Sequence, residues 1–594
     1  MTASRRILIV VGLLIAVAVG LPWGGGVPEA QAQTIQVTAA DPPTGEQGTI
    51  NLNVLIKGKG FKNGAKAKFY KTGTTDPAGV NVKSTLYVSS TQLVANIDIA
   101  DEAALALFDI EVRNADGRTG KGTELFSVTA KKVSACTAPD PVPTGGLCTS
   151  GQPGCLDTTF GQGTGKVIGP RYLDTGDISG RSAVAIQQIA GEARIVVVGR
   201  KNDVCTASSR PIWYIARYLS DGSLDPSFGS NGLVTITFAG SAAAHGVAIQ
   251  RVVGTDGVAR NKIIAVGYAQ PSKSSNKQPT AVRLNEDGSL DSTFGTSGMT
   301  FVPLAGKNSN GGLYAAAIQS DGKIVAAGFG PYWNTGLVLR LTSDGALDKT
   351  FNGTGLYAHT SSESRFQTVT TQLVGSEERI LAAGYTRYGG GAFIATVWRF
   401  TSLGAPDSGF GTSGIVMTSF HGDHTESYYE DEFTNLSIDS SHGLVAVGFA
   451  LTALPNTMPT SKMVLARYDE FGNLDTDFGV GGAAAVPSRQ SYELGYALAI
   501  QADGLIVVGG QSHDYDANGP VNNVARVWRF TATGAVDSTF GDNGSLLDAF
   551  TGAVRGVSCH GLVLQTDWTV LWAGEAVMNG DPRITYAVLA RFWQ

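Results

Sequence analysis

An aspartate inside a short turn-like stretch recurs along the chain, and it is the first residue whose type and spacing could do chemistry. It stands in GSLDPSFGSNG, residues 222–232, and near-copies return at intervals of 57 to 68 residues. A recurring carboxylate can act in acid–base catalysis, or it can cap a turn of the backbone. Asp225 precedes Pro226, which favours the first position of a helical turn, and Gly229 suits a left-handed end to that turn. The pattern therefore predicts a cap rather than a catalyst.

The same turn is expected at every copy of this stretch. One copy replaces the glycine by Asn352, one of the few other residues that tolerates a left-handed backbone. The leucine and phenylalanine that flank the turn are apolar, and we expect them to pack between neighbouring repeats. The aspartates of the series are Asp157, Asp225, Asp291, Asp348, Asp407, Asp475 and Asp537.

An arginine precedes all but the first of these aspartates at a constant spacing of eight residues. Because arginine can clamp a carboxylate with two hydrogen bonds, the constant spacing predicts a recurrent ion pair. Arg591 has no aspartate after it, and Asp157 has no arginine eight residues before it. These two residues match each other if the repeats close into a ring. The arginines are Arg217, Arg283, Arg340, Arg399, Arg467, Arg529 and Arg591.

Two segments carry residue types that could bind a metal. HGDHTESYYEDEF, residues 421–433, combines histidines with carboxylates, which suits zinc or manganese, but it also describes a solvated acidic loop. DYDANG, residues 514–519, opens like a calcium loop, yet Ala525 stands where the closing glutamate belongs, so a polar turn is the alternative. No cofactor is required, and Ca²⁺ or another divalent metal is the candidate. The candidate ligands are His421, Asp423, His424, Glu426, Asp514, Asp516 and Asn518.

Aromatic side chains in predicted loops are candidates for stacking against sugar rings, as in PYWN and YTRYGGG. The alternative is that they act as lids on the core. The candidate ligand-binding aromatics are Tyr332, Trp333, Tyr385, Tyr388, Tyr428, Tyr429 and Tyr515.

Catalytic motifs are missing from the sequence. It contains no GxSxG in a strand–turn–helix setting, no HExxH and no CxxC. A glycosidase needs two carboxylates at a set separation, and no pair is singled out here. His245 and His560 stand alone near predicted strand starts and are assigned structural roles. No catalytic residue is assigned, and the sequence favours a protein without enzymatic activity.

The elements that must position these residues are short strands. Within residues 313–357, the segments YAAAIQ, KIVAAG, LVLRLT and LYAHT read as four strands separated by turns. Four strands in a repeat of about sixty residues is the composition of a propeller blade. The predicted fold is all-β, with a seven-bladed β-propeller over residues 156–594. We expect GTGKVIG to supply the outer strand of the last blade, an exchange between N- and C-terminal strands that removes an open edge. A solenoid is the alternative, but it should carry distinct capping repeats.

The signature G.LD.sFG..G.v, with kivv.G and v.Ry before it, resembles the bacterial delta-60 repeat family over residues 156–594. Two departures are an extra residue before Gly165 and Pro406 in place of leucine. The resemblance implies a secreted or surface propeller-like protein and no defined enzyme activity.

Residues 33–130 do not share the repeat and alternate like the strands of a small β-sandwich. GTINLNVLIKGKGFKNGAKAKF and FDIEVRNADG resemble the immunoglobulin-like IPT/TIG domains. That resemblance implies a spacer or adhesion module. Residues 131–155 are rich in proline, glycine and cysteine and form the expected linker.

The N-terminus predicts export. Arg5 and Arg6 precede an apolar run, and Ala30 and Ala32 have the spacing of a cleavage site, so residues 1–32 are a predicted signal peptide. An uncleaved membrane anchor is the alternative, and no other segment has the length of a span. We therefore expect a secreted, periplasmic or cell-surface bacterial protein, with no membrane span after the signal is removed.

An exported chain can use disulfides, and this chain has five cysteines. Cys205 and Cys559 fall in neighbouring blades of a closed ring, on the same face. They are predicted to form a disulfide that staples the closure, and two unpaired cysteines are the alternative.

The expected partner is a glycan or another surface protein. A net charge of −6 argues against a nucleic-acid partner. In a propeller the signature turns occupy one face, so the variable loops fall mostly on the other, where binding is expected. The alternative is an extracellular carbohydrate-active enzyme, a hydrolase or lyase, that uses acids of the variable-loop face. The sequence does not determine the oligomeric state.

Overall fold

The computed structural model contains strands and turns, without helices, in the residues it describes. These residues are 34–47, 52–100, 102–129, 153–173, 183–202, 211–306, 309–331, 334–387, 391–421, 429–441, 443–452, 460–486, 492–516, 519–547, 554–565, 569–578 and 584–593. They divide into a first unit within residues 1–135 and a second within residues 136–594. Among the described residues no helix has the length and apolar character needed to span a membrane.

The first unit contains two four-stranded sheets around one core. One sheet has the order β1 (Gln36–Asp41), β3 (Leu52–Lys59), β6 (Gln92–Ile99), β5 (Val80–Ser89). The other has the order β2 (Thr44–Glu46), β8 (Thr119–Thr129), β7 (Leu107–Arg113), β4 (Lys66–Lys71). Burial alternates residue by residue along β6, as expected for a strand with one face toward a core. Side chains of both sheets, such as Ile56 and Phe108, meet in that core.

The second unit is built from antiparallel groups of four consecutive strands. The first three groups are β10 (Ala183–Ile189), β11 (Glu192–Asn202), β12 (Pro211–Tyr218), β13 (Leu233–Ile236); β14 (Ala242–Val253), β15 (Ala259–Ala269), β16 (Gln278–Leu284), β17 (Met299–Phe301); and β18 (Gly312–Ile318), β19 (Ile324–Phe329), β20 (Gly336–Leu341), β21 (Leu356–His359). In every group the recurring signature lies between the third and fourth strands.

Three further groups are linked into one larger sheet by single parallel bridges, Phe393 to Glu430 and Ser461 to Tyr492. These groups are β22 (Ser364–Val374), β23 (Glu377–Arg387), β24 (Phe393–Phe400), β25 (Ile415–Thr418); β26 (Tyr429–Ile438), β27 (Leu444–Thr452), β28 (Thr460–Tyr468), β29 (Ala483–Ala485); and β30 (Tyr492–Ile500), β31 (Ile506–Asp516), β32 (Gly519–Phe530), β33 (Ser545–Leu547).

The last group joins the two ends of the second unit. Its strands β34 (Val554–Leu564), β35 (Thr569–Met578) and β36 (Ile584–Trp593) come from the end of the chain, and β9 (Lys166–Leu173) from the start of the unit. β9 pairs antiparallel with β36. This is the strand exchange that the unmatched Asp157 and Arg591 indicated.

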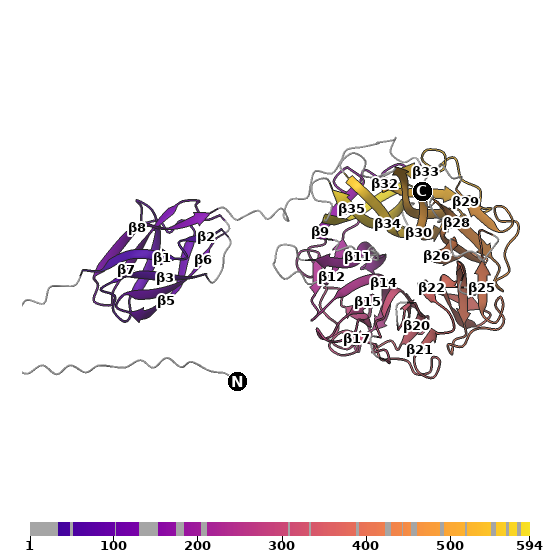
Figure 1. The fold of residues 1–594 in the computed structure, drawn as a ribbon, viewed down its shortest axis with the longest axis horizontal. Coiled ribbons are helices and arrows are strands. Elements are labelled where there is room, and N and C mark those ends of the chain that lie inside the picture. The colour runs from indigo at the N-terminus through magenta and orange to yellow at the C-terminus, as the bar shows by residue number, and fades with distance from the viewer. Residues whose placement is uncertain are drawn as a thin grey trace, which may run out of the picture. The chain divides into compact units, whose positions relative to one another are not determined.

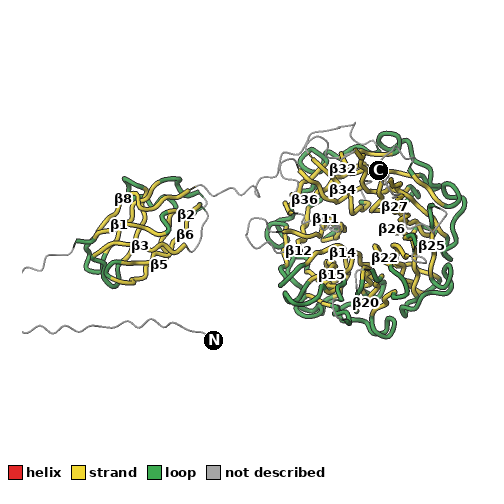
Figure 2. The backbone as a smooth tube through the Cα atoms, in the orientation of Figure 1, coloured by secondary structure: helices red, strands yellow, loops and turns green. Residues whose placement is uncertain are grey.

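The groups follow one another around a ring, with the first strand of each group toward the axis and the fourth toward the rim. Figure 1 shows β14, β22, β26 and β30 around the centre, and β17, β21, β25 and β29 outside them. The same ring of strands, with loops at its rim, is visible in Figure 2. The predicted all-β propeller architecture is therefore confirmed.

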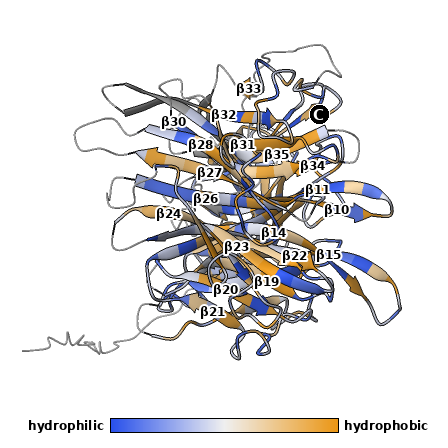
Figure 3. Cartoon of the chain, turned by 90° about the vertical axis from the view of Figure 1, so that its right-hand side faces the viewer, coloured by the Kyte–Doolittle hydropathy of each residue, from blue (hydrophilic) through white to orange (hydrophobic). Residues whose placement is uncertain are grey.

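Apolar side chains pack between neighbouring groups. Trp213 and Phe228 of one group share a cluster with Ala265 and Val282 of the next. Figure 3 shows the contrast between the hydrophobic second strand β27 and the more hydrophilic inner strand β26. A propeller needs its middle strands to be apolar on both faces, because each lies between two neighbouring sheets.

Six inner strands contain a β-bulge at the same place. In each, one extra residue is left unpaired opposite a glycine that ends the repeated kivv.G segment. A Cβ on Gly384, for example, would lie 1.9 Å from the carbonyl oxygen of Arg365. At four more of these glycines a Cβ would come within 1.8 to 2.1 Å of a carbonyl oxygen of the inner strand. The recurring glycine is therefore required by the bulge.

Gly384→Ala should destabilise the second unit, because the new methyl group meets fixed backbone rather than a movable side chain. We expect a loss of about 1 to 3 kcal/mol, seen as a lower midpoint in calorimetry. Gly409→Ala is the matched control, since its Cβ would meet nothing closer than 3.4 Å. Equal midpoints for the two variants would contradict the assignment.

Candidate functional site

The structure places every arginine of the series beside its aspartate. The seven Nε–Oδ2 distances lie between 2.6 and 2.9 Å. Arg591 reaches Asp157, so the two unmatched residues close the ring. Most of these side chains are nearly inaccessible, with 2% of Arg217 and 3% of Asp225 exposed. Buried charges of this kind must be paired, and here the pair is the repeating element of the framework.

Six of these arginines, all except Arg529, also donate a hydrogen bond to a backbone carbonyl of the next group. The guanidinium of Arg217 stacks 4.5 Å from the ring centre of Phe228 and donates to the carbonyl oxygen of Glu286 in the next group. Arg340 does the same with Phe351 and, at 2.5 Å, with the carbonyl of Ser402. The signature therefore ties neighbouring sheets together, and its carboxylates are held by cations in their own group.

The turn around each aspartate agrees in part with the cap predicted from the sequence. Oδ1 of Asp225 accepts the backbone N–H of Ser227 at 3.0 Å and its hydroxyl at 2.6 Å. The backbone is left-handed at Gly229, with φ +53°, and at its replacement Asn352, with φ +50°, as expected. The residues form an isolated turn rather than a helix. The packing expected of the leucine is wrong at Leu224, which is 38% exposed while Phe228 is fully buried.

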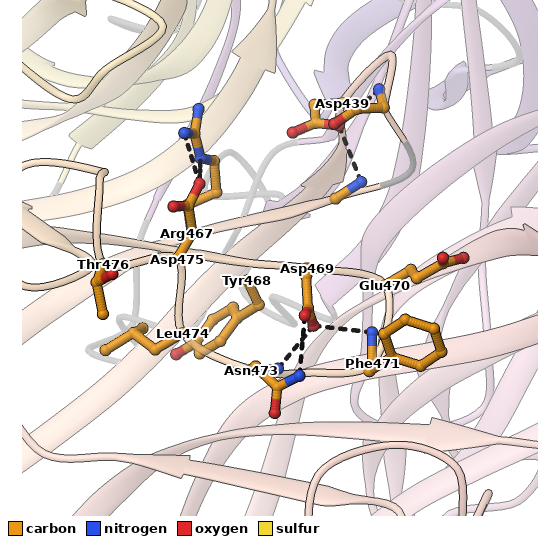
Figure 4. Close-up of a pocket in the computed structure, with 12 residues that line it drawn as sticks. Asp439, Arg467, Tyr468, Asp469, Glu470, Phe471, Asn473, Leu474, Asp475 and Thr476 are labelled. Atoms are coloured by element: carbon orange, nitrogen blue, oxygen red, sulfur yellow. Dashed lines mark hydrogen bonds and ion pairs between the residues drawn. The ribbon is translucent and has the colours of Figure 1, made fainter.

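One hollow on the signature face has a local cause. In three other groups a second cation lies close to the aspartate. Arg194 lies 3.3 Å from Asp225, and Lys262 lies 3.2 Å from Asp291. Gly443 takes that place beside Asp475, and a cavity of about 490 Å³ opens there (Figure 4). Its other carboxylates are engaged in turns; Asp469, for instance, accepts two backbone N–H groups. We attribute this hollow to the absence of a side chain at Gly443 and do not interpret it as a binding site.

The candidate metal loop begins with a histidine that is already engaged. Nδ1 of His421 lies 2.9 Å from Asp431, and Nε2 lies 2.8 Å from the hydroxyl of Thr452. The ring stacks on Tyr429 with a centroid distance of 4.4 Å. Both ring nitrogens thus have protein partners, and Tyr429 is occupied by the stack. Asp423, His424, Glu426 and Tyr428 lie outside the described residues.

The candidate calcium segment belongs in part to a hairpin. The backbone of Asp514, Tyr515 and Asp516 is the end of β31, and it pairs with residues 519–521 of β32. Asn518 lies outside the described residues. Among the residues described, no three histidine, cysteine, aspartate or glutamate side chains gather in a metal-binding group.

The remaining aromatic candidates divide between the core and the undescribed loops. Tyr385 is 8% exposed, and burial raises its pKa well above the usual range. It packs against Phe393 with a centroid distance of 4.8 Å. Tyr332, Trp333 and Tyr388 lie outside the described residues.

The predicted disulfide between Cys205 and Cys559 is wrong. Cys559 is a free, fully buried thiol, and burial raises its pKa. It lies in the core between β31 and β34, where a Cβ on Gly509 would meet its sulfur at 2.4 Å. Its side chain thus packs as a small apolar group. Cys155 is disulfide-bonded.

A second cavity, of about 170 Å³, lies where the inner strands meet. All of its lining residues come from the first strands of the groups. The six bulge residues are among them, and we call them the axial collar: His245, Tyr314, Gln367, Thr434, Tyr496 and His560.

The axial collar went unrecognised in the sequence, where both of its histidines were assigned structural roles. The available signal was the glycine that ends each second strand. It recurs without a turn to explain it, and an isolated glycine in a strand indicates a bulge or a close backbone approach.

Comparison with known proteins supports the architecture. Residues 194–228, 261–294, 319–351 and 501–540 match a family described as "Domain of unknown function (DUF5122) beta-propeller". These stretches are propeller repeats. Two of them begin within a second strand, β11 or β15, the other two begin in the turn before one, and all reach the signature phenylalanine. No curated protein matches the chain.

Several solved structures match the chain at low similarity. The polysaccharide lyase Uly1 is 10% identical, with a TM-score of 0.37, over 69% of this chain and 89% of its own. The mannose phosphorylase MPT-4 from Leishmania mexicana is 8% identical, with a TM-score of 0.24, over 59% and 84%. The Bombyx mori GH32 beta-fructofuranosidase BmSUC1 is 9% identical, with a TM-score of 0.24, over 74% and 94%. Likenesses at this level carry no argument about activity.

Gly409→Thr should stabilise the second unit. In the group of Arg340, the hydroxyl of Thr350 donates to Asp348 at 2.7 Å and accepts from the guanidinium at 2.9 Å. Gly409 occupies the equivalent place and has room for a side chain. We expect a gain of about 0.5 to 1.5 kcal/mol over Gly409→Ala, the control for the backbone effect, measured by calorimetry. A threonine variant no more stable than the alanine variant would refute this account.

Acid should weaken the ring through its carboxylates. Burial opposes ionisation of Asp291, but hydrogen bonds from Thr293 and the charge of Arg283 outweigh it and lower its pKa to about 2. A pKa lowered in the folded state gives stability that is complete above the unfolded value, about 3.9, and is lost toward pH 2. The temperature at the midpoint of thermal unfolding should therefore decrease as the pH is lowered from about 4 to about 2.

The control for this pH dependence is Asp291→Asn, which cannot ionise. Its midpoint should be lower near pH 7 and should decline less steeply in acid than that of the unmodified chain. Parallel curves for the two proteins would show that Asp291 does not contribute.

Proposed function

We propose that the protein is an exported, non-enzymatic binding or scaffold protein. Its propeller would present the variable-loop face to a glycan or another surface protein. One observation carries this proposal: the acids that recur through the repeats are each bound by an arginine, as Asp348 is by Arg340, and so belong to the framework. What differs from group to group in the sequence is the connecting segments, such as PYWN and HGDHTESYYEDEF, which we assign to the opposite face.

The proposal includes the finer architecture expected from the sequence. We infer seven blades, the last completed by β9, because each group contributes four strands and β9 pairs with β36. We further propose that the first unit is an immunoglobulin-like spacer of the IPT/TIG kind. Its two four-stranded sheets around one core support that assignment. A signal peptide over residues 1–32 would deliver the chain outside the cytoplasm.

The test records binding and chemistry together. The chain from Gln33 onward is incubated with a panel of polysaccharides, first with calcium and then with a chelator, while bound polymer and released reducing ends are both measured. We expect saturable binding without products. Released sugars would overturn the proposal in favour of a hydrolase or lyase, and silence in both measurements would remove glycans and leave a protein partner.

Paired variants locate the binding face. Replacing Tyr332 and Trp333 together by alanine should weaken binding at least tenfold, because aromatic anchors carry much of the energy of such contacts. Phe471→Ala is the matched control, since this aromatic residue is 54% exposed and lies directly before a signature turn on the other face. Loss of binding in the control alone would place the partner on the signature face and contradict the proposal.

A further inference from the structure

We propose that the axial collar binds one uncharged, hydroxyl-rich molecule of about monosaccharide size. This site is distinct from the variable loops and rests on observations of its own. Its failure would leave the proposal for the loops untouched, and the reverse also holds.

The axial collar is a product of the bulges. Each bulge adds one residue to an inner strand at the same height, and the residues added are polar or aromatic in all six strands. The signature keeps its residue types from repeat to repeat, whereas the axial collar changes from histidine to tyrosine, glutamine and threonine. A framework position would keep one type. Positions that face a shared cavity and differ in hydrogen-bonding groups are typical of a binding site.

Gln367 gives the cavity an acceptor that requires a hydrogen-bond donor. Its Nε2 donates to the carboxylate of Glu432, which accepts only, so this bond fixes which end of the amide is oxygen. The side chain is 5% exposed, and Oε1 has no hydrogen-bond partner among the protein atoms that the structure describes. A buried acceptor left without a donor destabilises the protein, because it has lost its water without gaining another partner. A ligand in the cavity that donates a hydrogen bond would remove this cost.

The lining argues for an uncharged ligand. No aspartate, glutamate, lysine or arginine is among the described residues that line the cavity. Two carboxylates contact the axial collar from outside the lining: Glu432 is bound to Gln367, and Glu575 lies 3.5 Å from Nε2 of His560. Both carboxylates are therefore already bound to side chains of the axial collar, and the described lining itself offers no charged side chain to replace the hydration that an ion would lose.

Aromatic rings supply the walls. His245 and Tyr314 lie 5.4 Å apart between ring centroids, and Tyr496 and His560 lie 5.0 Å apart. Thr434 donates to the carbonyl of Gly495 at 2.7 Å, which fixes two neighbouring inner strands to each other. Flat apolar faces with a few fixed polar groups suit a ring-shaped polyol, whose carbon-bound hydrogens meet the aromatic faces while its hydroxyls meet the amide.

The size agrees with a molecule of this class. A single water needs about 10 to 15 Å³ of space for its centre, so a cavity of about 170 Å³ holds several waters or one small ligand that replaces them. Displacing several confined waters with one molecule that reproduces their hydrogen bonds favours binding.

The experiment uses the chain from Gln33 onward and free sugars, measured by isothermal titration calorimetry. The uncharged probes are glucose, galactose, mannose and N-acetylglucosamine, and the charged counterparts are glucuronic acid and glucosamine. We expect at least one uncharged sugar to bind with one site per chain, and its charged counterpart to bind at least tenfold more weakly. This comparison needs no variant. Absence of saturable binding by every uncharged probe, or equal binding by the charged ones, would overturn the proposal.

Two glutamine variants then locate the site. Gln367→Leu should weaken the binding at least tenfold, because the acceptor is lost from the cavity. Gln319→Leu is the matched control: this glutamine is equally buried, at 6% exposure, and does not line the cavity. Its binding should be unchanged. Sugar binding that survives Gln367→Leu in a folded protein, or that falls equally in both variants, would contradict the assignment to the axial collar.

Discussion

The ring depends on one arginine in each repeat, which is paired with an aspartate and buried in most of the repeats. Arg217 shows why: its guanidinium is held by Asp225, lies over the ring of Phe228, and donates across to the backbone of the next group. Removing such a cation from water is costly, and the cost is offset only when every partner is in place. Sheet, turn and neighbouring sheet must therefore be assembled together. The arginine with its aspartate, phenylalanine and cross-group carbonyl, here called the clamp, therefore determines how neighbouring groups are placed in the ring and also stabilises them.

A second constraint acts at the other end of the same strands. The glycine that closes each second strand permits a bulge in the inner strand, and the bulge adds one residue at the axis. The framework therefore holds two kinds of repeated position. At the clamps the residue types hardly change, because any change breaks a bond between groups. At the axis only the glycine is fixed, and the side chain opposite it is free to vary. Binding properties can thus differ without cost to the ring.

The parts of this fold that the sequence predicted are those that repeat at fixed spacing. An arginine eight residues before an aspartate is enough to place both at one end of a strand and its turn. The same logic matched Arg591 to Asp157, and the exchange of glycine for Asn352 identified the left-handed position. Each of these follows from local backbone geometry, which a pattern of residue types records directly.

The parts that were missed depend on how strands pair. A bulge is a property of register between two strands, so His245 and His560 looked like isolated histidines. The disulfide assigned to Cys559 failed for a related reason, since adjacency in a ring does not say which face of a strand a side chain occupies. Leu224 was expected inside because it is apolar, but a turn at the surface buries only one of its two flanking residues.

The pairing of β9 with β36 has a consequence for how the molecule comes into being. The bond between Arg591 and Asp157 spans 434 residues of chain, so the ring cannot shut until its last strand has been made. Until then the groups form an open arc, and the group at each end of that arc has a neighbour on one side only. Contacts between residues so far apart in the sequence slow folding, because the chain loses the entropy of closing a large loop before the stabilising contacts form. The pairing of β9 with β36 is thus the last step of assembly, and its presence shows that the ring is closed.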